Sequence, residues 1–121
     1  MQERDRFTKA GVTKVEEFTN AVIFITTSTD EEAHKIAEVI LNQKKAACIN
    51  IVPKVSSRFW WQGKLDSAQE SLLIIKTKTA KLNEIVSLVR AVHSYDIPEI
   101  IALPIVGGNQ DYLDWIGNEV K

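Results

Sequence analysis

Two kinds of hydrophobic pattern alternate along the chain. Four short apolar runs, rich in β-branched residues, are typical of strands and lie at residues 21–27, 46–52, 70–77 and 99–106. Two longer segments, which follow Thr29 and Lys81, repeat apolar residues every three or four positions, as one face of a helix does. Residues 112–116 indicate a third, short helix. The predicted order is strand, helix, strand, strand, helix, strand, helix.

The first helix is predicted to begin at a capping box. Thr29 is followed three residues later by Glu32, so the threonine hydroxyl accepts an N-terminal amide while the glutamate reaches back to the cap. Lys44 and Lys45 are expected in the last turn, where cations complement the helix dipole. The apolar stripe of this helix comprises Ala33, Ile36, Ala37, Ile40 and Leu41.

Proline and glycine mark the ends of the strands. Pro53 stops the second strand or bends it, in which case residues 55–61 continue it. Residues 62–64 (QGK) predict a turn before the third strand. Pro104 places the fourth strand at a sheet edge or at a bulge.

This order predicts an α+β protein with a ferredoxin-like βαββαβ arrangement and an extra C-terminal helix. Residues 1–19 are expected to be a mobile or loosely docked extension of one domain at residues 20–121. The first and third strands are apolar at consecutive positions, so both faces of the sheet need cover. Two long helices suffice for one face. The second face predicts a symmetric oligomer, unless the final helix or the extension folds over it.

Composition excludes several classes of protein. The chain has 121 residues, 45% hydrophobic and 26% charged, which is typical of a globular domain and unlike a disordered chain or a membrane protein. A net charge of -1 offers no basic surplus for nucleic acid. The lone Cys48 cannot form an internal disulfide. We expect a soluble protein of the cytoplasm, with no nucleic-acid or membrane partner.

Five sequence strings, in order and in register, resemble one family. They are AACINI at residues 46–51, SRFWWQGK at 57–64, ESLLIIKT at 70–77, HSYDIPEI at 93–100 and YLDW at 112–115. Together they make residues 21–121 similar to the CutA family, the divalent-cation tolerance proteins.

The resemblance implies a ferredoxin-like homotrimer related in architecture to the PII signalling proteins. It also implies a cytoplasmic role in tolerance of copper or other heavy metals. This chain departs from the family pattern at three positions: Ser94 stands where relatives often have proline, and Thr26 and Val92 stand where some bacterial relatives carry cysteine and histidine. These departures count against a strong copper site.

The candidate cofactor is a divalent metal ion, and copper is the first candidate. His93 lies at a turn with Asp96 and Glu99 nearby, and Cys48 supplies the one thiol, so these four residues are the candidate ligands. The alternatives are that His93 caps the end of the second helix and that Cys48 is a small core residue. No C-x-x-C or H-E-x-x-H spacing occurs.

A second set of candidates comes from strand ends and turns within the same strings. If the hairpin and the 93–99 turn meet, they line a cleft between subunits, with aromatic walls and a few polar groups. The candidate cleft residues are Ser57, Trp61, Lys64, Lys76 and Tyr95. Trp60 and Trp115 are candidate interface anchors, because tryptophan is enriched at interfaces.

Two functions follow from these residues. One is a homotrimer that binds divalent cations and serves metal tolerance. The other is a regulatory or interaction trimer, similar to PII proteins, that binds a small ligand or a protein partner at intersubunit clefts. An enzyme is not expected, because the chain has no nucleophile elbow and no glycine-rich phosphate loop.

Overall fold

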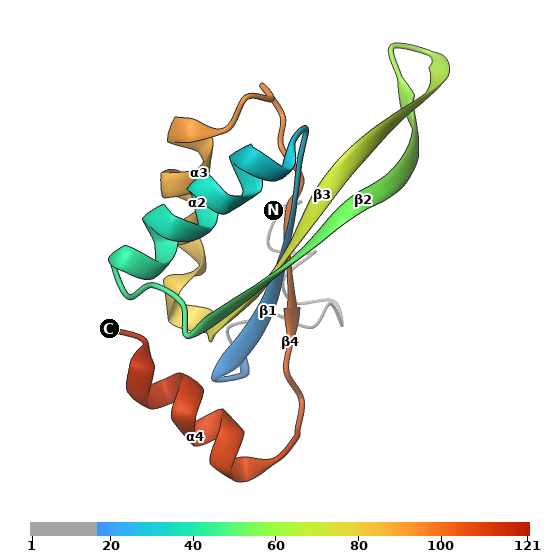
Figure 1. Ribbon diagram of the computed structural model, residues 1–121. Coiled ribbons are helices and arrows are strands. Elements are labelled where there is room, and N and C mark those ends of the chain that lie inside the picture. Colours follow the sequence, from blue (N-terminus) through green and yellow to red (C-terminus); the bar gives the residue numbers. More distant parts are fainter. Residues whose placement is uncertain (1–16) are drawn as a thin grey trace, which may run out of the picture.

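The computed structural model describes residues 17–121, which form a four-stranded antiparallel sheet and three α-helices (Figure 1). The elements are β1 (Asn20–Thr27), α2 (Asp30–Asn42), β2 (Cys48–Trp61), β3 (Lys64–Lys78), the 3-10 turn η2 (Thr79–Lys81), α3 (Leu82–Val92), β4 (Ile100–Pro104) and α4 (Gln110–Glu119). The strands lie in the order β2-β3-β1-β4, which confirms the predicted fold class and the edge position of β4. Most of the predicted extension, residues 1–16, lies outside the described residues.

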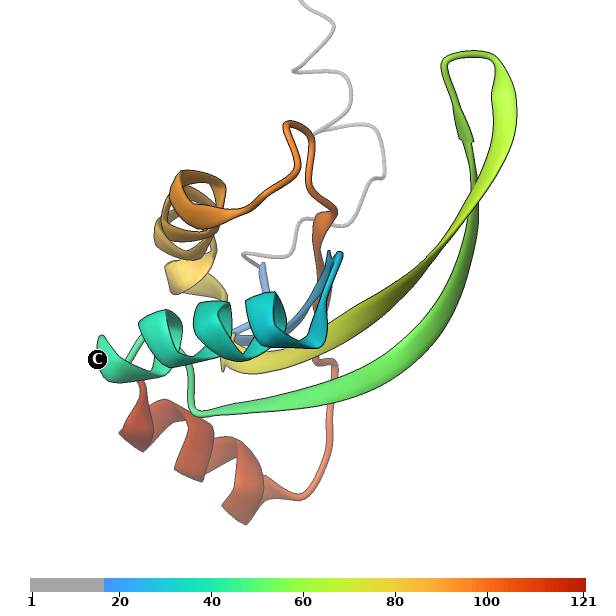
Figure 2. The same cartoon turned by 45° about the horizontal axis from the view of Figure 1, so that its top comes forward.

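One face of the sheet forms the hydrophobic core with α2 and α3, which both lie on that side (Figures 1 and 2). Side chains alternate along a strand, so Ile23 and Ile25 of β1 share this face with Leu73 and Ile75 of β3, and all four are fully buried. The buried helix residues that pack into the same core are Ala33, Ile36, Ala37, Ile40, Ile85 and Val89. Both predicted helical stripes therefore supply the core.

The opposite face of the sheet is apolar, and no helix within residues 17–121 covers its centre. Phe24 lies between Ile74 of β3 and Ile101 of β4 on this face. Ile101 remains 50% exposed, and Leu103, two residues along β4, is 44% exposed. The C-terminal helix α4 lies beyond the end of the sheet where β1 begins rather than over this face (Figure 1). We call this surface the uncovered face; it agrees with the sequence prediction.

The strands β2 and β3 extend past the rest of the sheet as a long hairpin arm, residues 55–70. Only Ser71–Lys78 of β3 pairs with β1, so the arm is two-stranded and curves away from the helices (Figure 2). The predicted bend at Pro53 is a register shift between Val52 and Val55, with Lys54 at a φ of 61°. The strand therefore continues through the proline.

Three local expectations were wrong. The helix α2 ends at Asn42, so Lys44 and Lys45 lie beyond its last turn, and Lys44 takes a positive φ of 57°. Leu41 is 38% exposed rather than part of the buried stripe. In the capping box, Thr29 accepts from the amide of Glu32 as expected, but the glutamate accepts from Ser28 instead of the cap residue.

Among the described residues, no helix is both long and apolar enough to cross a membrane.

The tip of the arm depends on a left-handed glycine. Gln62 and Gly63 have φ values of 51° and 80°, which is the two-residue turn that matches strand twist. A Cβ on Gly63 meets nothing within 4 Å, so Gly63→Ala is expected to cost only the conformational strain, about 1 kcal/mol of unfolding free energy. The measurement is urea unfolding at matched protein concentration.

Gly107→Ala is the matched control, because Gly107 also has open space around its Cβ position and has no positive φ. Equal losses in the two variants would contradict the proposed strain.

Candidate functional site

His93 fastens the turn between α3 and β4 to the rest of the fold. It is the C-terminal cap of α3, and its backbone N–H donates to the carbonyl of Val89. Its side chain is fully buried. Nε2 donates to the carbonyl of Thr26 at 2.8 Å, and Nδ1 accepts from the amide of Tyr95 at 3.0 Å. Both ring nitrogens are therefore occupied, and this pattern belongs to the neutral Nε2–H tautomer.

Glu32 holds the same turn from the side of α2. Its carboxylate accepts from the amide of Ser94 at 2.7 Å and from the Ser94 hydroxyl at 3.0 Å, and also from the amide of Ser28 at 3.2 Å. Burial raises the pKa of Glu32, but these hydrogen bonds outweigh it and hold the pKa below its ordinary value. The carboxylate thus stays ionised and ties two chain segments together.

A cleft of about 720 Å³ lies between the hairpin arm and this turn. Its lining combines aromatic, carboxylate and hydroxyl side chains, which is the usual composition of a ligand pocket. The lining residues are Thr26, Ser57, Arg58, Phe59, Trp61, Asp66, Glu70, Tyr95, Asp96, Ile97 and Glu99. The predicted meeting of the hairpin with the 93–99 turn therefore occurs, and it occurs within one chain.

The centre of the cleft is a cluster of two carboxylates and a phenol. The hydroxyl of Tyr95 donates to Glu70 at 2.7 Å, and Glu70 is only 8% exposed. Burial, this hydrogen bond and the negative charges of Glu70 and Glu32 raise the pKa of Tyr95 to about 12. Burial first, and then the charge of Glu70, raise the pKa of Glu99. In the part of the chain that the structure describes, no Lys or Arg forms an ion pair with Glu70 or Glu99.

The cleft continues the uncovered face of the sheet. Thr26 pairs with Leu72, and strand alternation puts both on the same face as Phe24 and Ile74. Glu70 is two residues before Leu72 on β3 and so shares this face. Any surface that packed on the uncovered face would therefore also border the cleft.

The structure brings together only some of the predicted site residues. Ser57, Trp61, Tyr95, Asp96 and Glu99 all line the cleft. Among the other predicted residues, Lys64 lies at the tip of the arm and Lys76 at the far end of β3, and neither lines the cleft.

Lys76 belongs to a different group of side chains, near the other end of the sheet. Its Nζ donates to the side-chain carbonyl of Asn50 and lies 4.0 Å from the sulfur of Cys48. Six residues separate Lys76 from Glu70 along the strand, which corresponds to about 20 Å. Within one chain, Cys48 therefore lies far from the cleft that contains the predicted ligands Asp96 and Glu99.

The two predicted interface tryptophans are exposed in the single chain. Trp60 is 73% exposed on the arm, opposite Leu65, which is 55% exposed. Trp115 is 40% exposed on α4 and packs against the ring of Tyr112 at a centroid distance of 5.4 Å.

Comparison with known proteins assigns the family. The model of the CutA1 divalent ion tolerance proteins matches residues 21–119. The chain belongs to this family. It is 45% identical over 100 residues to the chloroplastic protein CutA 1 of rice (Oryza sativa), covering 83% of this chain and 56% of that protein. It is 44% identical over 95 residues to the divalent-cation tolerance protein CutA of Thermus thermophilus, covering 78% and 92%.

Solved structures of the CutA1 family share the fold. The crystal structure of CutA1 from rice has a TM-score of 0.83 at 43% identity and covers 86% of this chain and 95% of that one. A CutA structure from Archaeoglobus fulgidus, described as periplasmic, has a TM-score of 0.81 at 44% identity and covers 84% and 99%. The chain spans little more than half the length of the plant proteins it matches.

The family name implies a divalent cation, but two of the four predicted ligands, His93 and Cys48, do not fit a shared copper site in a single chain. Both nitrogens of His93 are engaged in hydrogen bonds, and Cys48 lies at the other end of the sheet. Within residues 17–121, no three His, Cys, Asp or Glu side chains are grouped so that they would hold a metal ion. A soft-ligand copper centre built from His93 and Cys48 in one chain is therefore excluded by geometry.

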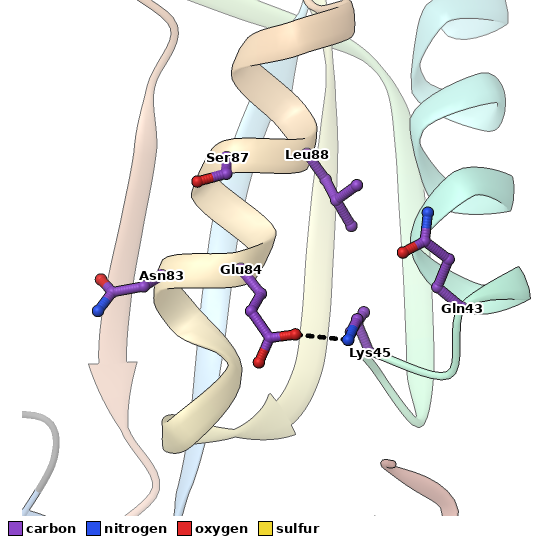
Figure 3. Close-up of a pocket in the computed structure, with 6 residues that line it drawn as sticks. All are labelled: Gln43, Lys45, Asn83, Glu84, Ser87 and Leu88. Carbon is purple, nitrogen blue, oxygen red and sulfur yellow. Dashed lines mark hydrogen bonds and ion pairs between the residues drawn. The ribbon is translucent and has the colours of Figure 1, made fainter.

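Two further pockets are weaker candidates for a functional site. One of about 390 Å³ lies between the end of α2 and α3 beside the ion pair of Lys45 with Glu84 (Figure 3). The other, of about 960 Å³, is an open groove between the start of β1, residues 105–108 and α4. In the first pocket the hydrogen bond from Lys45 holds the pKa of Glu84 below its ordinary value, whereas the cleft contains two groups with raised pKa values, Tyr95 and Glu99.

Glu70, the buried carboxylate of the cleft, is not among the predicted site residues, because the hydrophobic pattern marks it only as the first residue of a strand. The turn at Gln62 and Gly63 sets the hairpin register, and that register puts Asp66, Ala68 and Glu70 on the same face as Trp61. Counting by two from the turn would have found the residue.

The electrostatic coupling of Tyr95 to Glu70 is testable by titration. The difference in near-ultraviolet absorbance between wild type and Tyr95→Phe should show a phenol that titrates near pH 12. In Glu70→Gln it should move toward 10, because the neighbouring charge is gone. A transition already centred at 10 in the wild type would contradict the geometry.

The raised pKa of Tyr95 also determines the direction in which the stability of the protein changes at alkaline pH. The raised pKa means that folded Tyr95 holds its proton more strongly than unfolded tyrosine. Its contribution to stability is therefore present below pH 10 and is lost as the pH rises toward 12.

Proposed function

We propose that the protein is a homotrimer that serves divalent-cation tolerance by binding cations at the carboxylates of its cleft, without catalysing a reaction. The observation that carries the proposal is the pair Glu70 and Glu99. Glu70 is nearly fully buried, its charge raises the pKa of Glu99, and no described basic side chain pairs with either. A buried carboxylate without a counterion favours binding of a cation.

The assembly is supported by the uncovered face and the arm. Ile101 and Leu103 expose an apolar surface on the edge strand β4, and Trp60 with Leu65 exposes another on the arm. Exposed apolar patches and open strand edges mark interaction surfaces. A closed cyclic assembly is the usual way for identical chains to cover them, and the resemblance to CutA proteins implies three copies.

The chemistry of the cleft favours a harder cation than copper. Carboxylate, hydroxyl and carbonyl oxygens suit Mn²⁺, Mg²⁺ or Ca²⁺, whereas copper prefers imidazole and thiolate. One chain offers Glu70, Glu99 and the hydroxyls of Thr26 and Tyr95. Because the cleft borders the uncovered face, water or a neighbouring copy completes the coordination.

Family membership does not fix the cellular compartment. The rice relative is named as chloroplastic, and the Archaeoglobus structure is described as periplasmic. A cytoplasmic location for this chain remains a proposal, supported by its single cysteine, which is free in the structure.

The proposed assembly can be tested by introducing a charged side chain on the uncovered face. Sedimentation of the wild type at micromolar concentration should give three times the chain mass of 13.6 kDa. Leu103→Glu and Ile101→Glu should each shift the particles to the single-chain mass, because a buried unpaired charge costs several kcal/mol per copy.

Leu41→Glu is the matched control for assembly, since Leu41 is 38% exposed on α2, away from this face. A wild type that sediments only as single chains would refute the trimer.

Cation binding is tested by titration with Mn²⁺ followed by calorimetry. Glu70→Gln and Glu99→Gln should each weaken binding at least tenfold, since each removes one anionic oxygen ligand. Binding should also weaken as the pH falls through the raised pKa of Glu99, because a proton then competes with the cation.

Glu84→Gln and Cys48→Ser are the controls for cation binding. Glu84 is an exposed residue paired with Lys45, and Cys48 lies at the far end of the sheet. Loss of Mn²⁺ binding in Cys48→Ser, with Glu70→Gln unaffected, would contradict the placement of the site.

A further inference from the structure

A metal ion leaves most of the cleft unused. The volume of about 720 Å³ falls in the range of small-molecule pockets, which run from roughly 300 to 1,000 Å³. Phe59, Trp61 and Ile97 form part of the lining and offer nothing to a hydrated cation. These apolar groups suit a ligand with an apolar part.

Exposure changes across the cleft. Glu70 is 8% exposed, whereas Phe59 is 37%, Trp61 is 50% and Ile97 is 77% exposed. The carboxylate thus lies in the most protected part, and the apolar side chains lie toward the solvent.

The charge of the cleft is one-sided. Four carboxylates line it, from Asp66, Glu70, Asp96 and Glu99. Arg58 is the one basic residue in the lining, and strand alternation directs its side chain to the face of the arm opposite Ser57 and Phe59. Anionic ligands are therefore repelled.

We propose that the cleft binds an organic cation, an ammonium or guanidinium group on an apolar stem. The charged group binds at Glu70 and Glu99, where charge-assisted hydrogen bonds are strongest. The stem packs along Phe59, Trp61 and Ile97, and the aromatic rings add cation–π attraction. This inference goes beyond the proposed cation-tolerance role and uses the same carboxylates.

The test uses phenethylamine as the probe and the neutral 2-phenylethanol as its isostere. Calorimetry on the full chain should show phenethylamine binding at least ten times more tightly than the alcohol. Phenethylamine should also raise the unfolding midpoint, because a ligand of the folded state stabilises it. Equal affinities for the two probes would overturn the proposal.

Variants separate the charged part from the apolar part. Glu70→Gln should weaken phenethylamine binding at least tenfold, and Glu84→Gln, on the exposed face of α3, should not change it. Trp61→Ala should weaken it several-fold, and Trp61→Phe should restore most of the affinity, since an aromatic ring remains. Failure of Trp61→Phe to restore binding, with the fold intact by circular dichroism, would overturn the role of the ring.

The same cationic group has two sources: a free amine, or a basic side chain on the arm of a neighbouring copy. If the source is a free amine, phenethylamine binds the wild type directly. The double variant Glu70→Gln with Glu99→Gln then assembles as the wild type does. If instead a basic side chain of a neighbouring copy occupies the cleft, the double variant dissociates at a higher protein concentration than the wild type does. Arg58→Gln or Lys64→Gln then removes that side chain and opens the cleft to phenethylamine. No binding in any of these proteins, with unchanged assembly, would overturn the inference.

Mn²⁺ distinguishes this inference from the proposed function. Binding of phenethylamine without Mn²⁺ binding would refute the cation role and leave the organic ligand. Mn²⁺ binding with no phenethylamine binding in the wild type or in Arg58→Gln and Lys64→Gln, and with unchanged assembly of the double variant, would do the reverse. Mutual competition is expected if both occupy Glu70 and Glu99.

Discussion

The described part of the chain contains one mismatch on which the rest depends: a small sheet that is apolar on both faces has helices on only one of them. The helices α2 and α3 bury Ile23, Ile25 and their neighbours completely, whereas Phe24 and Ile101 on the other face have no such cover. An exposed apolar face of this kind is stable in water only when another surface packs on it. The proposed assembly would provide that surface, and the cleft lies at the edge of the face that it would cover.

The cleft forms where three segments far apart in sequence converge. The arm supplies Trp61 and Glu70, β1 supplies Thr26, and the turn after α3 supplies Tyr95. The turn is rigid because a continuous set of hydrogen bonds runs from Glu32 on α2 through Ser94, and from Thr26 through His93 to Tyr95. Tyr95 then donates to Glu70 and closes the connection between the turn and the arm. The carboxylates therefore sit in a preformed site.

Local patterns predicted the elements, their order, the edge position of β4 and the apolar second face, because these depend on period and on residues close in sequence. The cleft was predicted only in outline. Ser57, Trp61, Tyr95 and Glu99 were placed there because they lie at strand ends and turns. Lys76 lies six residues from Glu70 along β3, about 20 Å, a distance that no local pattern encodes, and so it does not line the cleft of the single chain. Glu70, by contrast, follows from the hairpin register by counting in steps of two from the turn.

His93 shows why residue type alone does not assign a ligand. Imidazole is a common metal ligand, and the position of His93 at a turn suggested that role. Yet a buried imidazole must satisfy both nitrogens, and Thr26 and Tyr95 already do so. A metal ion would have to displace a backbone hydrogen bond and loosen the turn that positions Tyr95. Glu70 is the opposite case: it accepts one hydrogen bond from Tyr95 and keeps a charge that no described cation neutralises. A ligand is therefore expected at Glu70, whose charge has no counterion, rather than at His93, whose ligand chemistry is more familiar.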